Sequence, residues 1–468
     1  MNATGYLRMG RFLALWLPLA AVAATAQWDP PQGQWGKTDP RDVRVMTYNI
    51  YDHICRNADK SETAKPWHAL ARLVAALRPD VLLLQEAGDN DGNGTPGGLD
   101  SVAQLERTLD LFLHGGIDPF LPGGPVGAYV QKYAPGYDLP FIFVSPLNDG
   151  YNRNVLLSRF PFGDLNGDGL ATRGDISGIL PDLYAPGGNG GIRGFLFVEL
   201  DLPDLDYAGD LVVGGAHLKA GQTQSDKDER ERAARNVAYY VDYLFNGGGT
   251  GVPDPRGKIM DNPPATRILD ADTPVVLGGD WNEDELTNGR KGPAEWLVTA
   301  ELLGGTDGTD RDRSDATYDA SVEPYTGSRA TQANGYKYDH LAWQDSIATL
   351  RRSFVFYSNS LAAAPAWLPP ELAGYPPPYD ASRTASDHRP VIADFVLPPP
   401  TWPKGDLNCD GRVDFGDINP FVLALSNPAG YQVLYPGCPL LNGDINSDGR
   451  FDFGDINPFV ALLANPLR

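Results

Sequence analysis

Short runs of apolar residues that end in polar ones recur along most of this chain. The run over 43–48 leads into Asn49, and the run over 81–84 leads into Glu86. Because apolar side chains follow one another in most of these runs, they predict strands that are covered on both faces. Further strands are expected over residues 154–158, 195–200, 211–213, 274–277, 338–343, 354–357 and 391–396.

Helical spacing of apolar residues occurs in fewer places. Residues 69–77 form one apolar stripe, which Pro79 ends. A second helix is expected from Ser225, where a capping-box-like start precedes an apolar stripe over 237–244. A third is expected over 293–304, between a proline that opens it and a glycine that closes it. Strands interleaved with few helices predict an α/β fold of two packed sheets flanked by helices.

Changes in composition divide the chain into regions. Residues 27–41 are rich in Pro, Gly and Trp and are interpreted as a linker. Residues 398–404 begin with PPPTWP, a stiff and extended spacer. We therefore expect a large domain over 42–397 and a separate C-terminal module over 405–468. A length of 468 residues suits one large domain plus a small one.

The first 26 residues have the three parts of an export signal. Two arginines precede an apolar run over 12–24, and the small-residue site Ala-Thr-Ala occupies 24–26. The alternative is a transmembrane anchor, but the run is shorter than the roughly 20 residues that a span needs. We expect a signal peptide over 1–26 and a secreted or extracytoplasmic protein without a stable membrane span.

The net charge of −22 restricts the classes of partner. An acidic surface argues against tight, nonspecific binding of nucleic acid, which depends on Lys and Arg. It does not exclude cleavage of nucleic acid, since a bound metal supplies positive charge locally. The three cysteines are too few for a disulfide-dense scaffold. Cys409 and Cys438 share the C-terminal module and are predicted to form a disulfide after export, which leaves Cys55 without an assigned role.

Eight polar side chains are candidates for chemistry, and most of them follow an apolar run. Alone, an Asn, Glu or His at such a position is usually a turn residue or structural. Together they are metal ligands and acid/base groups, and the strand ends of a sandwich converge on one rim. They are therefore predicted to share one pocket: Asn49, Glu86, His217, Asp280, Asn282, Asp339, Asp387 and His388.

These residues lie in motifs with a recognisable order. The motifs are TYN, LLLQE, AHL, GGDWN, YDHL and SDHRP, together with a strand NVLLSRFP. This order resembles that of the endonuclease/exonuclease/phosphatase family, which includes pancreatic-type deoxyribonucleases, abasic-site endonucleases, neutral sphingomyelinases and inositol-polyphosphate phosphatases. The resemblance covers roughly residues 42–397. It implies a four-layer α-β-β-α sandwich and a metal-dependent hydrolase of phosphoric esters.

The resemblance also implies a metal site. Glu86 would be the main carboxylate ligand of Mg²⁺ (or Mn²⁺), with Asn49 beside it and Asp387 in the same shell. Carboxylate and amide oxygens suit such a hard cation. The chain has no His/Cys cluster with zinc spacing, so a zinc site is disfavoured.

The remaining site residues would carry the catalysis. Asp280 and Asn282 would position the attacking water and hold the phosphate oxygens, and His217 would contact the phosphate from the other side. Asp339 would pair with His388 and hold its imidazole in one tautomer, so that it acts as an acid or base. His340, next to Asp339 in the chain, is interpreted instead as a strand residue that packs away from the site.

Two departures from the family pattern bear on the substrate. Residues 89–100 and 164–175 form Gly/Asp-rich insertions that resemble calcium loops, and a flexible acidic turn explains them equally well. No obvious cluster of Arg and Lys near the motifs would grip long DNA, which argues against a processive nuclease.

The C-terminal module contains an internal repeat with an offset of 38 residues, 444 − 406. Each copy matches a calcium loop, with a glycine at the sixth position of the loop. All eight acidic residues of the module fall on ligand positions, which a random acidic surface explains poorly. The expected Ca²⁺ ligands are Asp406, Asn408, Asp410, Asp414 and Asp417 in the first copy and Asp444, Asn446, Asp448, Asp452 and Asp455 in the second.

The two loops, each followed by a short apolar helix, resemble a dockerin type I module. The resemblance implies docking onto a cohesin-type protein, whereas the alternative is a calcium-stiffened appendage without a partner. Phe421, Val422 and Leu425 are expected to pack on the equivalent residues of the second copy, Phe459, Val460 and Leu463.

Four hypotheses for function follow. The first is an extracellular nuclease or phosphodiesterase acting on DNA or RNA. The second is a phosphatase or sphingomyelinase acting on a lipid or a small phosphate ester. The third, a catalytically inactive cohesin-binding protein, conflicts with the intact Glu86, Asp280, Asn282 and His388. The fourth, a polysaccharide-degrading enzyme, leaves Asn49 and the two histidines without a role.

Overall fold

The computed structural model describes residues 27–54, 59–88, 100–120, 124–146, 148, 152–164, 195–240, 269, 271–288, 292–295 and 317–464. Five sequence predictions fall wholly or partly outside these residues: the signal peptide, Cys55, most of the two inserted loops, and the ends of the second and third helices. Among the described residues, no helix is both long and apolar enough to cross a membrane.

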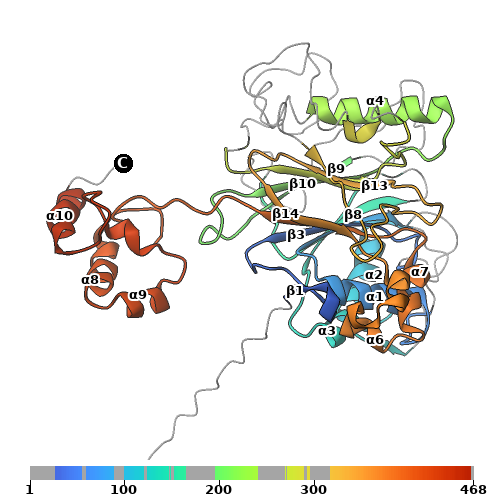
Figure 1. The fold of residues 1–468 in the computed structure, drawn as a ribbon, viewed down its shortest axis with the longest axis horizontal. Helices are drawn as coiled ribbons and strands as arrows, with labels where there is room; N and C mark the ends of the chain where they lie inside the picture. The colour runs from blue at the N-terminus through green and yellow to red at the C-terminus, as the bar shows by residue number, and fades with distance from the viewer. Residues whose placement is uncertain are drawn as a thin grey trace, which may run out of the picture.

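Two mixed sheets form the centre of the large domain (Figure 1). The six-stranded sheet has the order β14 (Thr349–Val355), β15 (Val391–Val396), β3 (Val43–Asn49), β4 (Val81–Ala87), β8 (Arg153–Ser158) and β7 (Phe141–Val144). The five-stranded sheet has the order β12 (Thr317–Tyr318), β13 (Asp339–Trp343), β11 (Val275–Asp280), β10 (Leu211–His217) and β9 (Phe195–Leu200).

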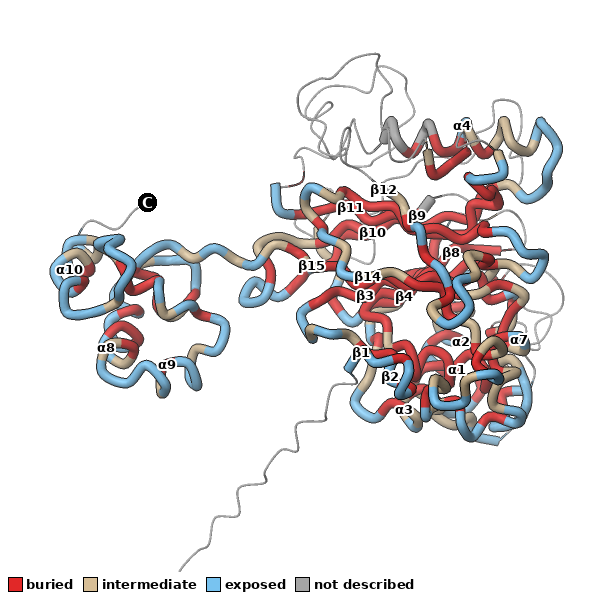
Figure 2. Tube along the Cα trace, viewed as in Figure 1, coloured by how far each residue is buried: buried red, intermediate tan, exposed pale blue. Residues whose placement is uncertain are grey.

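Helices cover the outer face of each sheet, as Figure 1 shows. The six-stranded sheet carries α1 (Pro66–Leu77), α2 (Val102–His114), α3 (Tyr129–Tyr133), α6 (Pro370–Ala373) and α7 (Ala381–Ala385), and the five-stranded sheet carries α4 (Gln224–Tyr240). One buried apolar cluster fills the space between the two sheets, and a second lies between the six-stranded sheet and its helices. The four-layer α-β-β-α arrangement expected from the sequence is therefore present, and the buried strands account for their continuous apolar runs (Figure 2).

The region expected to be a linker, residues 27–41, is part of the large domain. It forms a small hairpin of β1 (Trp28–Asp29) and β2 (Gln34–Trp35) around a short 3-10 helix (Pro30–Gln32). Trp35 is only 2% exposed, and its indole Nε1 donates a hydrogen bond to the carbonyl of Trp367. The linker prediction was wrong because burial of Trp35, with Trp28 packed partly buried against the same core, outweighs the cost of ordering a Pro- and Gly-rich segment.

Most of the other expected elements are confirmed, with local differences. The strand expected over 354–357 begins earlier, at Thr349, because its first half is only partly covered and lacks a continuous apolar run. Helix α2 was missed, although Ser101 begins it with a capping box to Gln104. Shorter elements complete the domain: β5 (Gly116–Ile117), β6 (Pro125–Val126) and 3-10 helices over Ser358–Ala363, Pro365–Trp367 and Pro378–Asp380.

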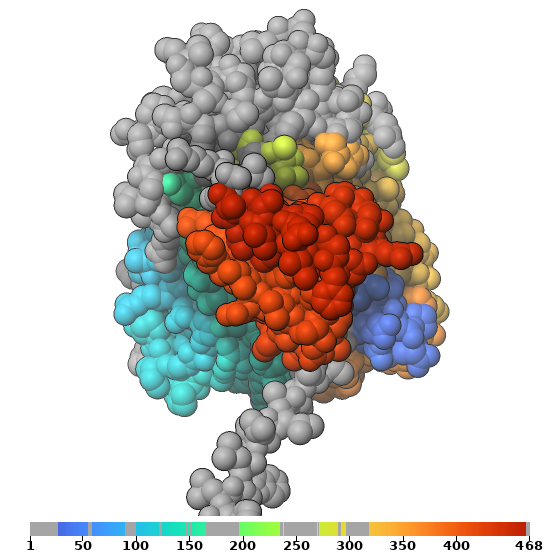
Figure 3. All heavy atoms as spheres, turned by 90° about the vertical axis from the view of Figure 1, so that its left-hand side faces the viewer, coloured from blue at the N-terminus to red at the C-terminus, as the bar shows by residue number. Residues whose placement is uncertain are grey.

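The C-terminal module is a separate lobe, joined to the large domain by an extended segment (Figure 1). Figure 3 is viewed from the side of the module, which lies in front of the large domain. It consists of α8 (Ile418–Ser426), α9 (Pro428–Leu434) and α10 (Ile456–Ala464), with 3-10 helices over Phe415–Asp417, Leu440–Gly443 and Phe453–Asp455. Helix α9 was not expected from the repeat. The predicted disulfide between Cys409 and Cys438 is present.

The core of the module differs in part from the expected one. Phe421 and Phe459 stack with ring centroids 4.2 Å apart, as the repeat symmetry predicts. Val422 and Val460, which were expected to join that core, are each 57% exposed. Together with Phe421 and Phe459 they line an apolar groove formed by residues of α8 and α10, so they are not enclosed in the core.

Candidate active site

The predicted site residues of the five-stranded sheet lie side by side. Strands β10 and β11 are parallel and end in register at His217 and Asp280. Strand β13 is antiparallel to β11, so its first residue, Asp339, pairs with Asp280. In the other sheet, β3 ends at Asn49. The parallel strand β4 ends at Ala87, one residue after Glu86. The strand ends bring these residues to one edge of the sandwich, as the sequence predicted.

The backbone at the ends of β4 and β11 is unusual. Glu86 has φ +56° and lies within an irregularity in the register of β4 and β8. Asn282 has φ +54°, a left-handed conformation that non-glycine residues seldom adopt. Gly279 has φ +153°, and a Cβ atom there would lie 1.8 Å from the carbonyl oxygen of Ala216. The glycine therefore allows β11 to approach β10 closely at the point where His217 and Asp280 meet.

A cluster of carboxylates surrounds the amide of Asn49. Its Nδ2 donates to Glu86 Oε1 and to Asp280 Oδ2, each at 3.0 Å, and its Oδ1 accepts from the backbone N–H of Tyr51. His217 Nε2 lies 3.4 Å from Asp280 Oδ2 and 3.9 Å from Glu86 Oε1. Asn49 thus holds two carboxylates close together that would otherwise repel each other.

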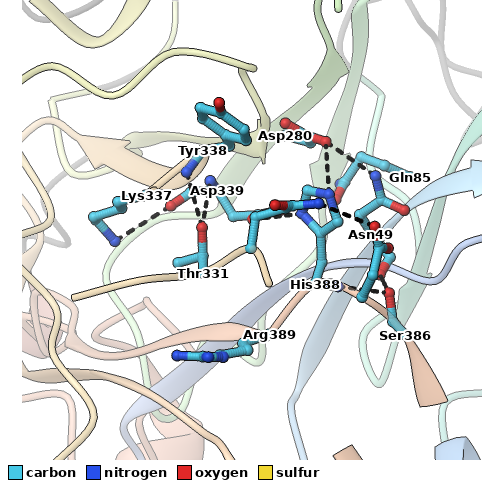
Figure 4. Close-up of polar contacts among 12 residues, drawn as sticks. Asn49, Gln85, Asp280, Thr331, Lys337, Tyr338, Asp339, Ser386, His388 and Arg389 are labelled. Atoms are coloured by element: carbon cyan, nitrogen blue, oxygen red, sulfur yellow. Dashed lines mark hydrogen bonds and ion pairs between the residues drawn. The ribbon is translucent and has the colours of Figure 1, made fainter. Parts of the chain in front are cut away.

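His388 and Asp339 form the predicted pair. His388 Nδ1 lies 2.8 Å from Asp339 Oδ2, and its Nε2 lies 3.6 Å from Asp280 Oδ2 (Figure 4). Burial by itself would lower the pKa of His388, but Asp339 and Asp280 outweigh it and raise this pKa to about 10. Burial also raises the pKa of Asp280, against the opposing effect of His388. The site therefore favours a protonated imidazole beside a carboxyl group that binds protons readily.

Two hydroxyl groups that the sequence analysis did not single out hold this pair in place. Ser386 Oγ donates to the carbonyl of Asn49 at 2.7 Å and accepts from the backbone N–H of His388 at 3.0 Å. Thr331 Oγ1 accepts from the backbone N–H groups of Tyr338 and Asp339. Ser386 stands in the SDHRP motif and could have been found there, whereas nothing in the sequence around Thr331 marks it.

Asn282 and Asp387 lie beside this centre. Asn282 Nδ2 donates to the carbonyl of Leu218, and its backbone N–H donates to Asp280 Oδ1 at 2.9 Å. Asp387 Oδ2 accepts from Gln332 Nε2 at 3.0 Å, while its buried Oδ1 has no hydrogen-bond partner among the described residues.

His340 belongs to the core, as expected. Its ring stacks on Trp281 with centroids 5.3 Å apart, and its Nε2 lies 3.0 Å from the carbonyl oxygen of Glu283. Burial lowers the pKa of His340, which keeps the imidazole neutral.

The donor set fits a hard divalent cation. In the described part of the chain, two groups of side chains are close enough to hold an ion: Glu86, His217 and Asp280, and Asp280, Asp339 and His388. Oxygen atoms predominate among these donors, and Asp387 supplies a further buried oxygen whose hydrogen-bonding capacity is unused by the described residues. The site thus offers the ligands that Mg²⁺ or Mn²⁺ prefers.

The loops of the C-terminal module bring their carboxylates together less closely. Asp417 Oδ1 accepts from the backbone N–H groups of Leu407 and Asn408, and Asp406 Oδ2 accepts from that of Gly411. Burial raises the pKa of Asp406 and of Asp417. In the described residues of the module, no three acidic, His or Cys side chains lie as close together as those of the two active-site groups, each of which has two carboxylates and a histidine. The loop shape is therefore present, and occupancy by calcium stays a prediction.

One protein family matches most of the chain. The family model described as "Endonuclease/Exonuclease/phosphatase family" matches residues 46–388. The chain belongs to this family, and it is an enzyme that hydrolyses phosphoric esters. The match spans all eight predicted site residues and ends at His388. A search of curated proteins found no match.

Several solved structures are similar to the chain at low identity. An endonuclease/exonuclease/phosphatase from Beutenbergia cavernae is 22% identical, with 76% of this chain and 72% of that chain covered and a TM-score of 0.39. D. rerio TDP2 complexed with single strand DNA product is 15% identical, with 76% and 99% covered and a TM-score of 0.38. Beta toxin from Staphylococcus aureus is 12% identical, with 75% and 99% covered and a TM-score of 0.39.

Proposed function

We propose that the large domain is a Mg²⁺- or Mn²⁺-dependent phosphodiesterase that acts on nucleic acid outside the cytoplasm. The observation that carries this proposal is the junction of two groups at Asp280. The Oδ2 atom of this carboxylate lies next to both groups: Asn49 and His217 of the cluster with Glu86, and His388 of the His388–Asp339 pair. Such a site can neutralise an anionic phosphodiester and orient a water molecule beside it.

Different residues of the site would hold the metal ion, activate the water molecule and bind the phosphate. Glu86, with Asn49 and Asp387 nearby, would hold the cation, which supplies polarisation of the phosphoryl oxygen and stabilisation of the leaving alkoxide. Asp280, whose pKa is raised, is suited to accept a proton from the attacking water. Protonated His388 would stabilise the negative charge that develops on the phosphate, and Asn282 and His217 would hold its oxygens.

A substrate panel tests this proposal. Purified protein is assayed on DNA, RNA, sphingomyelin and a nitrophenyl phosphodiester, with Mg²⁺ or Mn²⁺ and with chelator. We expect cleavage of nucleic acid that depends on the metal. Absence of cleavage of every phosphate ester with either metal would overturn the proposal. Cleavage of sphingomyelin or of small phosphate esters alone would favour the second hypothesis.

The C-terminal module is proposed to bind Ca²⁺ and to dock onto a cohesin-type protein. Its acidic residues lie in two equivalent loops, and each copy exposes apolar side chains. Phe415 and Phe453 stand at equivalent positions and are 77% and 78% exposed, and Val422 and Val460 add to the same kind of surface. Exposed apolar residues in this arrangement are typical of a protein interaction site. A pull-down with a panel of cohesin domains in calcium and in chelator tests it, with a Phe415→Ser/Phe453→Ser variant as control, and binding that survives both changes would contradict it.

Export of the protein is supported by two features. The first 26 residues have the pattern of a signal peptide, and the disulfide between Cys409 and Cys438 needs an oxidising compartment to persist. Mass spectrometry of protein recovered from the culture medium is expected to find Gln27 as the first residue and the two cysteines bridged. Retention of the intact N-terminus in a cytoplasmic fraction would argue against export.

A further inference from the structure

A tight turn carries the residues next to the active site. The carbonyl of Tyr336 accepts hydrogen bonds from the backbone N–H groups of Thr331 and Gln332, and Gly335 takes φ +96° inside the turn. The turn is attached to the catalytic segment at several points. Gln332 forms an isolated bridge to His388, and the backbone N–H of Arg389 donates to the carbonyl of Thr331. Any residue exposed on this turn is therefore held at a fixed place relative to His388.

Two tyrosines extend outward from this turn as a stacked pair. The rings of Tyr336 and Tyr338 have centroids 5.7 Å apart and planes that differ by 14°. Tyr338 is 8% exposed, whereas Tyr336 is 44% exposed. The inner ring is thus covered, and the outer ring presents aromatic surface to solvent without being buried in the domain.

The inner ring is anchored to the part of the site that holds the phosphate. Gln222 Nε2 lies 3.3 Å both from Tyr338 Oη and from the carbonyl oxygen of Asn282. Asn334 Nδ2 also lies within reach of Tyr338 Oη, at 3.4 Å, and the backbone N–H of Trp281 donates to the carbonyl of Tyr338. Gln222 therefore links Asn282 to the inner ring of Tyr338, and the outer ring of Tyr336 lies at the surface.

We propose that Tyr336 and Tyr338 form a stacking platform for the base next to the scissile phosphate, so that the substrate is a base-bearing strand presented as a single strand. This inference rests on the proposed function and adds the substrate class. A phosphate held at Asn282 and His388 would place the adjoining nucleoside beside the stacked rings. Bases in a duplex are already stacked on each other, whereas those of a single strand are free to stack on an aromatic side chain.

The charges around the turn favour stacking over contacts with several phosphates. Lys337 Nζ lies 2.7 Å from Asp319 Oδ1, and Arg329 contacts Asp284. The guanidinium of Arg389 lies over the ring of Tyr357. These basic side chains are engaged within the protein, so we expect binding of short strands to depend weakly on salt.

The experiment compares two single-stranded substrates that share a sugar–phosphate backbone. One is a short oligothymidylate, and the other is an abasic strand of the same length. The variants are Tyr336→Ala, Tyr336→Phe, which keeps the ring, and Tyr325→Ala as a matched control. Tyr325 is an exposed tyrosine, 38%, whose ring contacts Trp367 instead of the site.

We expect Tyr336→Ala to lower kcat/KM on the oligothymidylate by on the order of tenfold, mainly through KM. The same variant should cleave the abasic strand like the wild type, and Tyr336→Phe and Tyr325→Ala should resemble the wild type on both. An equal loss on both substrates would assign Tyr336 a structural role and overturn the inference, as would no loss on either.

Failure of the inference differs from failure of the proposed function. If the wild type cleaves neither strand in Mg²⁺ or Mn²⁺ but cleaves sphingomyelin or another phosphate ester, the nucleic acid substrate class is wrong. If it cleaves no phosphate ester at all, the proposed phosphodiesterase activity itself is wrong. If it cleaves both strands equally well and the ring of Tyr336 is dispensable, only the stacking platform is wrong.

Discussion

The large domain and the C-terminal module place the same side chain, aspartate, in different settings. Asp280 and Asp339 are 1% and 0% exposed and stand at strand ends above an extensive buried cluster. In the module, Asp406, Asp417 and Asp455 are also 0% exposed, but Asp410 and Asp448 are exposed in loops that lie over a core of seven buried residues. The positions of the first pair are set by sheet register and packing, before any cation binds.

This difference separates two uses of a metal ion. In the large domain a cation would complete a site whose ligands are already oriented, so it serves the chemistry. In the module a cation would bring together carboxylates that otherwise repel one another, so its binding free energy would add to folding free energy. Metal removal should therefore stop the activity of one region and unfold the other.

The largest expected effect is the loss of the His388 imidazole. We expect His388→Ala to lower kcat/KM for a phosphodiester roughly a hundred- to thousand-fold, because the group that stabilises developing charge is removed. Since the strands and not this side chain set the fold, the circular dichroism spectrum should stay unchanged. Steady-state assays in saturating Mg²⁺ measure the effect.

Two further variants make this result specific. Glu86→Gln should lose most activity as well, because it weakens the proposed metal site. His114→Gln replaces a partly exposed histidine of α2 and should retain activity. A folded His388→Ala protein with near-normal turnover would show that the His388–Asp339 pair has no catalytic role.

Calcium removal should affect the module and leave the large domain folded. At a calcium concentration about a hundred times the Kd, binding contributes about 2.7 kcal/mol to stability. Calorimetry of the full chain should show two transitions in calcium, and EGTA should lower only that of the module. The double variant Asp406→Asn/Asp444→Asn should behave in calcium as the wild type does in EGTA. A module transition that EGTA leaves unchanged would contradict the assignment of these loops.

Gly279→Ala tests whether the close packing of β10 against β11 determines the positions of the catalytic carboxylates. The added Cβ would meet the carbonyl oxygen of Ala216, so β10 and β11 would have to separate. We expect a loss of about 1–3 kcal/mol in the stability of the large domain and a loss of activity beyond that due to unfolding. Gly124→Ala is a control, because a Cβ there meets nothing within 4 Å. Wild-type stability of Gly279→Ala would show that the strands tolerate a wider spacing.

The site was predictable where a residue type and a strand end coincide. Asn49, His217 and Asp280 each follow an apolar run, and parallel or antiparallel register then fixes which strand ends meet. Ser386 could have been found from its place in the SDHRP motif, but its contact with the carbonyl of Asn49, 337 residues away, could not. Thr331 accepts from backbone N–H groups seven and eight residues further on, and a threonine in a loop carries no sequence pattern for such a contact.

The fold was predictable to a similar extent and for related reasons. Long apolar strands gave the two sheets, whereas the hairpin over 27–41 resembled a linker because its buried residues are few and widely spaced. In the module, the repeat predicted the stacking of Phe421 on Phe459 but not helix α9. The exposure of Val422 depends on helix orientation, which a short apolar run does not specify.

The smallest expected effect is a dependence of stability on pH that belongs to the large domain alone. His114 Nδ1 lies 2.7 Å from Asp110 Oδ1, and its Nε2 lies 2.8 Å from Asp138 Oδ1. Burial by itself would lower the pKa of His114, but the two carboxylates outweigh it and raise this pKa above 6.5. The module contains no histidine, so it has no such group to titrate near neutral pH.

The sign of the effect follows from the raised pKa of His114 in the folded protein. The stabilisation is fully present below about pH 6.5, the pKa of an unfolded histidine, and is lost as the pH rises through the folded value. Because both carboxylates and the imidazole are partly exposed, we expect only roughly 0.2–1 kcal/mol. Urea unfolding of wild type and His114→Gln should therefore differ at about pH 5.5 and agree at about pH 9. Contributions of His388 to the free energy of unfolding cancel in this comparison because both proteins contain His388. A difference in stability between the two proteins that grows with pH would show that the carboxylates do not favour the charged imidazole of His114.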